Sequence, residues 1–106
     1  MEQLEYIKLY WNYIDDETPI VIFYEIALEN ERYATRMIEV FSDRKTVPVV
    51  EDGFEFITET SVPTVDDINK EDEFFAEIIS REEFEEAYRC SVYSGNVWFP
   101  KTIPNV

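Results

Sequence analysis

The 106-residue chain contains no histidine and a single cysteine, Cys90. Without histidine, the commonest general base and the commonest nitrogen ligand for metals are both missing. Ser-His-Asp and Cys-His catalytic arrangements are therefore excluded, and one cysteine cannot form an internal disulfide. Because Cys90 has acidic neighbours and no histidine partner, we expect an inert structural thiol in a cytoplasmic protein.

Glycine and long apolar runs are scarce as well. Two glycines and five prolines favour long regular elements and leave no glycine-rich phosphate loop. The longest apolar run, residues 19–24, is far too short to cross a bilayer. Residues 1–3 begin neither a basic nor an apolar stretch, so we expect no secretion signal and no membrane association.

The sequence also lacks a recognisable metal or cofactor site. Asp67, Asn69, Glu71 and Glu73 alternate as in a calcium loop, but the glycine of the sharp turn and the terminal bidentate acid are missing. Paired carboxylates could in principle hydrolyse a glycosidic bond, yet among 24 acidic residues some pair falls at suitable spacing by accident. We therefore predict no enzyme activity, no metal and no cofactor.

Acidic charge dominates what the chain does contain. Nine basic and 24 acidic residues give a net charge of −15, and residues 51–86 alone hold 14 acids against 2 bases. Such a field repels nucleic acid and anionic lipid and attracts basic partners. The alternative is that the charge serves solubility alone.

Alternating apolar residues predict strands in the first half of the chain. With 45% hydrophobic residues, the chain has material for one core and one domain. We predict a domain over residues 1–92 and an irregular tail, 93–106, that Trp98 and Phe99 anchor to it. The predicted strands are residues 4–13, 20–29, 32–41, 46–50 and 54–60.

The second and third of these strands read as a hairpin around Asn30 and Glu31. If that turn has two residues, position i lies opposite position 61 − i throughout. This register places Glu25 opposite Arg36 and Glu29 opposite Arg32, two pairs of opposite charge. For Glu25 and Arg36 we favour a cross-strand ion pair on a partly exposed face over a functional polar site.

Two capping boxes predict helices in the second half, one beginning after Thr64 and one after Ser80. Between them, residues 74–79 are apolar enough for a strand or a buried extended segment. In the second helix the predicted inward residues are Phe84, Ala87, Tyr88 and Ser91 or Val92, and the predicted solvated ones are Glu82, Glu85, Glu86 and Arg89. The predicted fold is α+β: an antiparallel meander of about five strands with one or two helices packed on one face.

Five segments then occur in a recognisable order. They are YIKLYW (6–11), FYEI (23–26), Arg32 with RMIEVFSD (36–43), VPTVDDIN (62–69) and ISREEF (79–84). Together they resemble, over residues 5–88, a family of short acidic bacterial domains of unknown function. Members of that family resemble acidic α+β domains that occur beside polymorphic or contact-dependent toxins, and the resemblance therefore implies an immunity role. Residues 46–60 lack the family's glycine-rich stretch and the tail is longer, so these regions would carry partner specificity.

From charge and resemblance together we expect an immunity protein that neutralises one cognate toxin domain, in particular a basic nuclease. The alternative is an acidic adaptor or regulatory domain unrelated to toxins. We expect a monomer or weak dimer that binds neither nucleic acid nor membrane. The predicted partner-binding residues are Glu51, Asp52, Glu55, Glu59, Asp66, Asp67, Glu71, Asp72 and Glu73.

Overall fold

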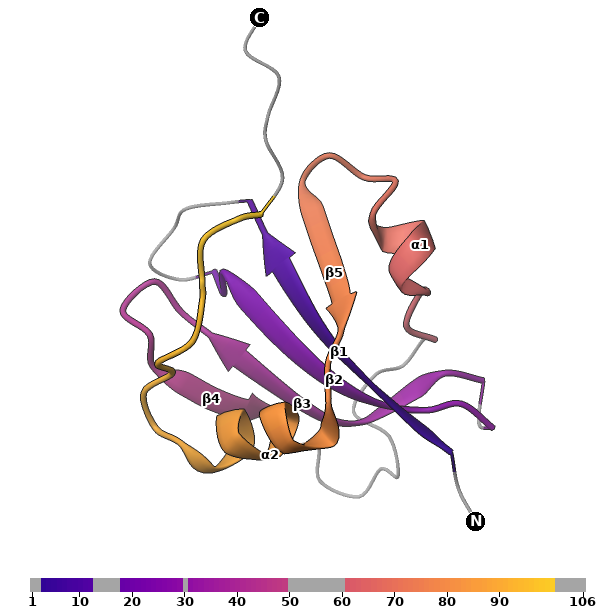
Figure 1. The fold of residues 1–106 in the computed structure, drawn as a ribbon, viewed down its shortest axis with the longest axis horizontal. Coiled ribbons are helices and arrows are strands. Elements are labelled where there is room, and N and C mark those ends of the chain that lie inside the picture. The colour runs from indigo at the N-terminus through magenta and orange to yellow at the C-terminus, as the bar shows by residue number, and fades with distance from the viewer. Residues whose placement is uncertain (1–2, 13–17, 30, 50–60, 101–106) are drawn as a thin grey trace, which may run out of the picture.

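Five antiparallel strands form one sheet in the order β4-β3-β2-β1-β5, with two short helices against it (Figure 1). The computed structural model describes residues 3–12, 18–29, 31–49 and 61–100. The elements are β1 Leu4–Trp11, β2 Val21–Ala27, β3 Tyr33–Val40, β4 Thr46–Val49, α1 Val65–Ile68, β5 Phe74–Ile78 and α2 Arg81–Arg89. The predicted α+β class with a five-stranded antiparallel sheet is confirmed.

The fifth strand of the described sheet comes from the second half of the chain. Strands β1 to β4 form a meander, and β5 then pairs antiparallel with β1 at the opposite edge from β4. The ambiguous segment 74–79 is therefore mostly a strand. The strand predicted at residues 54–60 lies outside the described residues.

The predicted hairpin register is confirmed from Val21, opposite Val40, to Glu25, opposite Arg36. Beyond Glu25 the register is wrong by one residue, because a bulge places Ile26 opposite Ala34. The extra residue is Thr35, whose hydroxyl lies 2.7 Å from the Glu25 carboxylate. The hydroxyl of Thr35 thus donates to Glu25 of β2 at the point where the backbone pairing of β2 and β3 is interrupted.

The second predicted ion pair of this hairpin, Glu29 with Arg32, is also wrong. Paired strands end at Ala27 and Tyr33, and Arg32 instead contacts Glu5 at 3.0 Å. Because the last paired residues are Ala27 and Tyr33, the connection is longer than a two-residue type I′ loop, and Glu31 and Arg32 in it have positive φ angles of 55° and 61°. The Arg32 side chain also donates to the carbonyl of Val62 at 2.8 Å, which connects the β2–β3 turn to the segment before α1.

Side chains alternate along the strands and build a core on each face of the sheet. Tyr6, Phe23 and Ile38 point to the face that α2 covers through Phe84 and Ala87. The opposite face carries a second cluster, which includes Ile7, Leu9, Ile22 and Ile26 and which α1 reaches through Ile68. Helix α1 has four residues, and Ile68 is its buried residue.

Both predicted helix starts are confirmed by their caps. The Thr64 hydroxyl accepts from the Asp67 amide at 3.2 Å, and the Ser80 hydroxyl accepts from the Glu83 amide at 3.1 Å. The end of the second helix was placed too late. Helix α2 stops at Arg89, and Val92 is 58% exposed in an isolated bridge to Lys45.

Residues 93–100 follow the α2 side of the sheet without regular structure. Tyr93, Val97 and Phe99 pack on the α2-side core, whereas Trp98 is 77% exposed and does not anchor the tail as predicted. Arg44 holds the start of this segment through hydrogen bonds from its guanidinium to the Tyr93 and Gly95 carbonyls, at 3.0 and 2.7 Å.

Candidate functional site

The structure brings five of the predicted partner-binding residues together on one side of the molecule. Asp66 and Asp67 belong to α1, and Glu71, Asp72 and Glu73 follow it in the connection to β5 (Figure 1). All five are exposed. We call them the α1–β5 acidic segment. The other four predicted residues, Glu51, Asp52, Glu55 and Glu59, lie outside the described residues.

The capping chemistry of α1 holds the acidic segment in place. Asp67 lies in the first turn, where the helix dipole favours an acid. Hydrogen bonds with the Lys70 ammonium, at 3.2 Å, and with the Thr64 side chain lower the pKa of the Asp67 carboxyl. Because both side chains of this ion pair are more than half exposed, it adds little stability and can be exchanged for another cation.

Asn69 ties the same segment to the sheet. Its side-chain amide donates to the Ala76 carbonyl at 3.0 Å and accepts from the Ala76 amide at 2.7 Å. The side chain thus satisfies the outward-facing backbone of β5 as a neighbouring strand would. Helix α1 and the edge of the sheet are thereby held in one arrangement.

An apolar groove of about 460 Å³ lies between α1 and the β1–β2 face. Asp67 and Glu71 are the charged residues in its lining. The rest of the lining is Leu9, Trp11, Ile22, Tyr24, Val62, Pro63, Ile68 and Phe74. Carboxylates of the acidic segment therefore border an apolar depression, which is a combination suited to protein recognition.

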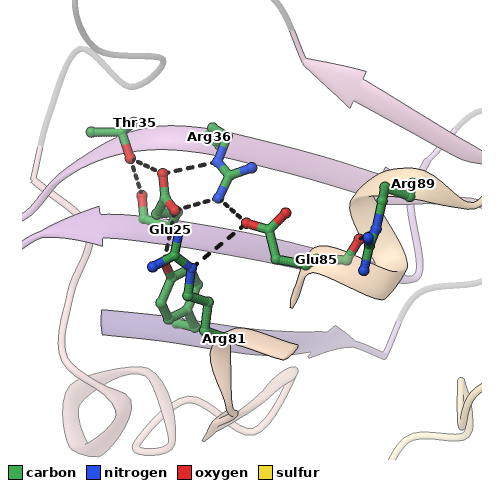
Figure 2. A network of polar contacts seen from close by, with 7 residues as sticks. Glu25, Thr35, Arg36, Arg81, Glu85 and Arg89 are labelled. Atoms are coloured by element: carbon green, nitrogen blue, oxygen red, sulfur yellow. Dashed lines mark hydrogen bonds and ion pairs between the residues drawn. The ribbon is translucent and has the colours of Figure 1, made fainter. Parts of the chain in front are cut away.

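A buried ionic network occupies the other face of the sheet (Figure 2). The expected cross-strand ion pair of Glu25 and Arg36 is confirmed; Glu25 is buried, at 6% exposed, whereas the Arg36 side chain is partly exposed, at 27%. One Glu25 oxygen accepts from Thr35 and from Arg36 Nε at 2.7 and 2.9 Å, and the other accepts from Tyr6 and Arg36 Nη2 at 2.8 and 2.6 Å. Arg36 also binds Glu85, which is half-buried and not on the solvated helix face as predicted.

The network leaves Glu25 without a role in proton transfer near neutral pH. Burial opposes ionisation of Glu25, but hydrogen bonds from Arg36, Thr35 and Tyr6 outweigh it and lower the pKa to about 2. The hydrogen bond to Glu25 in turn raises the pKa of Arg36. The Arg36 guanidinium also lies 4.9 Å from the ring centres of Phe84 and Tyr88. These contacts connect β1, β2, β3 and α2, which is a structural role.

Lys8 was not recognised from the sequence. It is 4% exposed, and its ammonium donates to the Tyr93 hydroxyl and the Asn96 carbonyl, both at 2.7 Å. Burial lowers the pKa of Lys8, and the ammonium lies 4.7 Å from the centre of the Tyr10 ring. The signal was present, because Lys8 shares a strand face with Tyr6 and Tyr10, two core positions.

Lys8 forms part of the lining of a pocket of about 770 Å³ between β5, α2 and the tail. The lining also includes Glu77, Glu83, Glu86 and Cys90.

Among the residues that the structure describes, no group of three or more His, Cys, Asp or Glu side chains could hold a metal ion. Within the same residues, no helix combines the length and apolar character needed to cross a membrane.

The fold and these surfaces define a small acidic α+β protein with an apolar groove bordered by carboxylates. The sequence profile of a family described as a domain of unknown function (DUF6881) matches residues 5–93, and the chain belongs to that family. Neither a curated protein nor a solved structure matches the chain. The family assignment carries no link to toxins.

Proposed function

We propose that this chain is an immunity protein that binds a cognate bacterial toxin domain through the α1–β5 acidic segment. The observation that carries the proposal is that five exposed acids follow one another in α1 and the connection to β5, and that two of them, Asp67 and Glu71, line an apolar groove. The neighbourhood implied by the sequence resemblance supplies the kind of partner.

A basic nuclease is the class of toxin that this surface suits best. Nucleases hold phosphates on cationic surfaces, and an acidic protein can occupy such a surface in place of nucleic acid. The carboxylates of Asp66, Asp72 and Glu73 are exposed and can meet lysine and arginine side chains without first leaving the core. Binding would block the toxin by charge complementarity and exclusion of substrate.

The test is to identify the genes adjacent to the one that encodes this chain and to co-express the chain with a candidate toxin domain encoded there. We expect the wild-type protein to co-purify with it and to restore growth of cells that express it. Asp66→Lys with Asp72→Lys should weaken binding and protection, whereas Glu82→Lys with Glu86→Lys changes net charge equally on the α2 side and should have less effect.

Absence of complex formation and of protection would overturn the immunity proposal. An equal loss of binding and protection in both charge-reversal pairs would show that the binding surface is not the α1–β5 acidic segment, even if the chain is an immunity protein. Binding to a nearly neutral partner would contradict the nucleic-acid-mimic mechanism alone.

A further inference from the structure

The apolar groove beside α1 is larger than a packing gap and lies on the face of the sheet opposite α2. Its volume of about 460 Å³ falls in the range of clefts that bind side chains or small ligands. Leu9 and Ile22 form its floor from adjacent strands and are less than 10% exposed. Trp11 and Phe74, whose ring centres lie 5.6 Å apart, form part of the wall where β1 meets β5.

Helix α1 forms one side of the groove. With four residues, α1 contributes Ile68 to the core, and Ile68 lines the groove together with Leu9 of β1 and Ile22 of β2. Asn69 and the Thr64 cap hold α1 in place. The depression is therefore built into the fold.

Charge complementarity identifies the occupant. The two charged lining residues are both carboxylates, Asp67 and Glu71, and Asp66, Asp72 and Glu73 extend the same sign around them. An acidic peptide or an anionic small molecule is repelled from such a border, while a basic segment is attracted. An apolar side chain that enters between the carboxylates removes apolar surface from water on both partners.

We propose that the groove receives one large apolar side chain of the protein partner, flanked by a lysine or arginine that pairs with Asp67 or Glu71. The identification of that partner as a toxin domain rests on the proposed function; the chemistry of the anchor does not. The acidic segment would govern the association rate, and the desolvated anchor would govern the dissociation rate.

A peptide titration followed by methyl NMR tests the groove without any toxin. The probe is a pentapeptide of lysines around a central phenylalanine. We expect saturable shifts of the Leu9, Ile22 and Ile68 methyl signals, with little change for Val21 and Ile38 on the α2 side. The control peptides replace phenylalanine by glycine, or every lysine by glutamate, and should produce much smaller shifts.

Shifts of equal size with the glycine peptide would show that charge alone binds and would overturn the anchor. So would the absence of shifts at the groove methyls with the phenylalanine peptide. Equal shifts with the glutamate peptide would show an apolar site without charge selection, which contradicts the stated occupant.

A matched pair of variants tests the two carboxylates. Asp67→Lys with Glu71→Lys reverses acids four residues apart at the groove, and Glu82→Lys with Glu86→Lys reverses acids of the same spacing on α2. We expect about tenfold weaker peptide binding for the first pair and less than about threefold for the second, since exposed charges distant from the site are screened. Asp67→Asn with Glu71→Gln should give an intermediate loss if the lysine pair destabilises α1.

The outcomes separate the groove from the proposed function. If the peptide binds the groove but the chain neither binds nor neutralises the co-expressed toxin domain, the groove proposal stands and the immunity role is overturned. If the chain does not bind the peptide and the Asp67 and Glu71 variants neutralise the toxin as wild type does, the immunity role stands and the groove proposal is overturned. Equal weakening by both variant pairs would assign the effect to net charge and overturn the placement of the anchor.

Discussion

Among the residues that the structure describes, two charged side chains, Glu25 and Lys8, are buried, and their surroundings differ. Glu25 receives donors on both oxygens, and its pKa falls to about 2. Lys8 is matched with a hydroxyl and a carbonyl, which carry no formal charge, and burial lowers its pKa. The carboxylate is thus stabilised by its neighbours, whereas the ammonium is retained at a desolvation cost.

Acid should remove the contribution of Glu25. Because the folded-state pKa is depressed from 4.5 to about 2, the stabilisation is present above the unfolded-state value and is lost as pH falls through that window. The shift corresponds to about 3 kcal/mol. Urea unfolding at several pH values should show a steeper loss between pH 4.5 and 2 for wild type than for Glu25→Gln.

The Glu25→Gln variant should itself be less stable at neutral pH, because Arg36 loses its buried counter-ion. Glu82→Gln, at an exposed position, is the control and should follow the wild-type pH profile. Parallel profiles for wild type and Glu25→Gln would contradict the assignment of the acid transition to this network.

Gly95 is required by a close approach. A Cβ at this position would lie 2.2 Å from the Tyr93 hydroxyl oxygen, the atom that accepts from Lys8. Gly95→Ala must displace the Tyr93 ring, and we expect a loss of about 1–3 kcal/mol in the free energy of unfolding. Ser94→Ala, at the exposed neighbouring position, should stay within about 0.5 kcal/mol. Equal denaturation midpoints for the two variants would show that the tail repacks freely.

At the scale of elements, short helices depend on their caps. Helix α2 has nine residues, a length that is marginal in isolation, so its first turn matters. Replacing Ser80 with alanine removes the acceptor for the Glu83 amide and should destabilise by about 1 kcal/mol in thermal or urea unfolding. Ser91→Ala, beyond the helix end, is the matched control, and a similar cost there would show that Ser80 does not act as a cap.

The edge of β5 depends on one side chain in a comparable way. Asn69→Ala would remove both bonds to the Ala76 backbone and expose a strand edge to pairing. We expect self-association that rises with protein concentration in sedimentation velocity, together with reduced stability. Lys70→Ala leaves the edge covered and should sediment as wild type does. A variant that sediments as wild type does at every concentration would contradict the blocking role of Asn69.

At the scale of the whole molecule, a net charge of −15 acts at long range. If the proposed toxin partner is cationic, the association rate should fall steeply as salt rises, because exposed charges are screened beyond a Debye length of about 8 Å at physiological ionic strength. The dissociation rate should change less, since it depends on contacts that exclude water. Surface plasmon resonance over a salt series would measure both, and a salt-independent association rate would contradict electrostatic steering.

Part of the candidate site could be predicted because local chemistry determines it. Acids that follow Thr64 predicted an exposed helix start, and Asp66 and Asp67 lie there. The groove could not be predicted, since Leu9 and Ile68 are far apart in the chain and meet only in the folded sheet. Lys8 was missed for a related reason: its partners Tyr93 and Asn96 are more than 80 residues away.

The sequence by itself determined the α+β class, the strands from β1 to β4, the starts of both helices and the concentration of acids after residue 50. Those features depend on side-chain period, capping and composition, which act between near neighbours. Only the tertiary structure decided that β5 pairs with β1, that Thr35 bulges toward Glu25 and that Glu85 joins Arg36. Each depends on which distant segments share a core, because a buried charge or an unpaired backbone group is tolerated only where the fold supplies its partner.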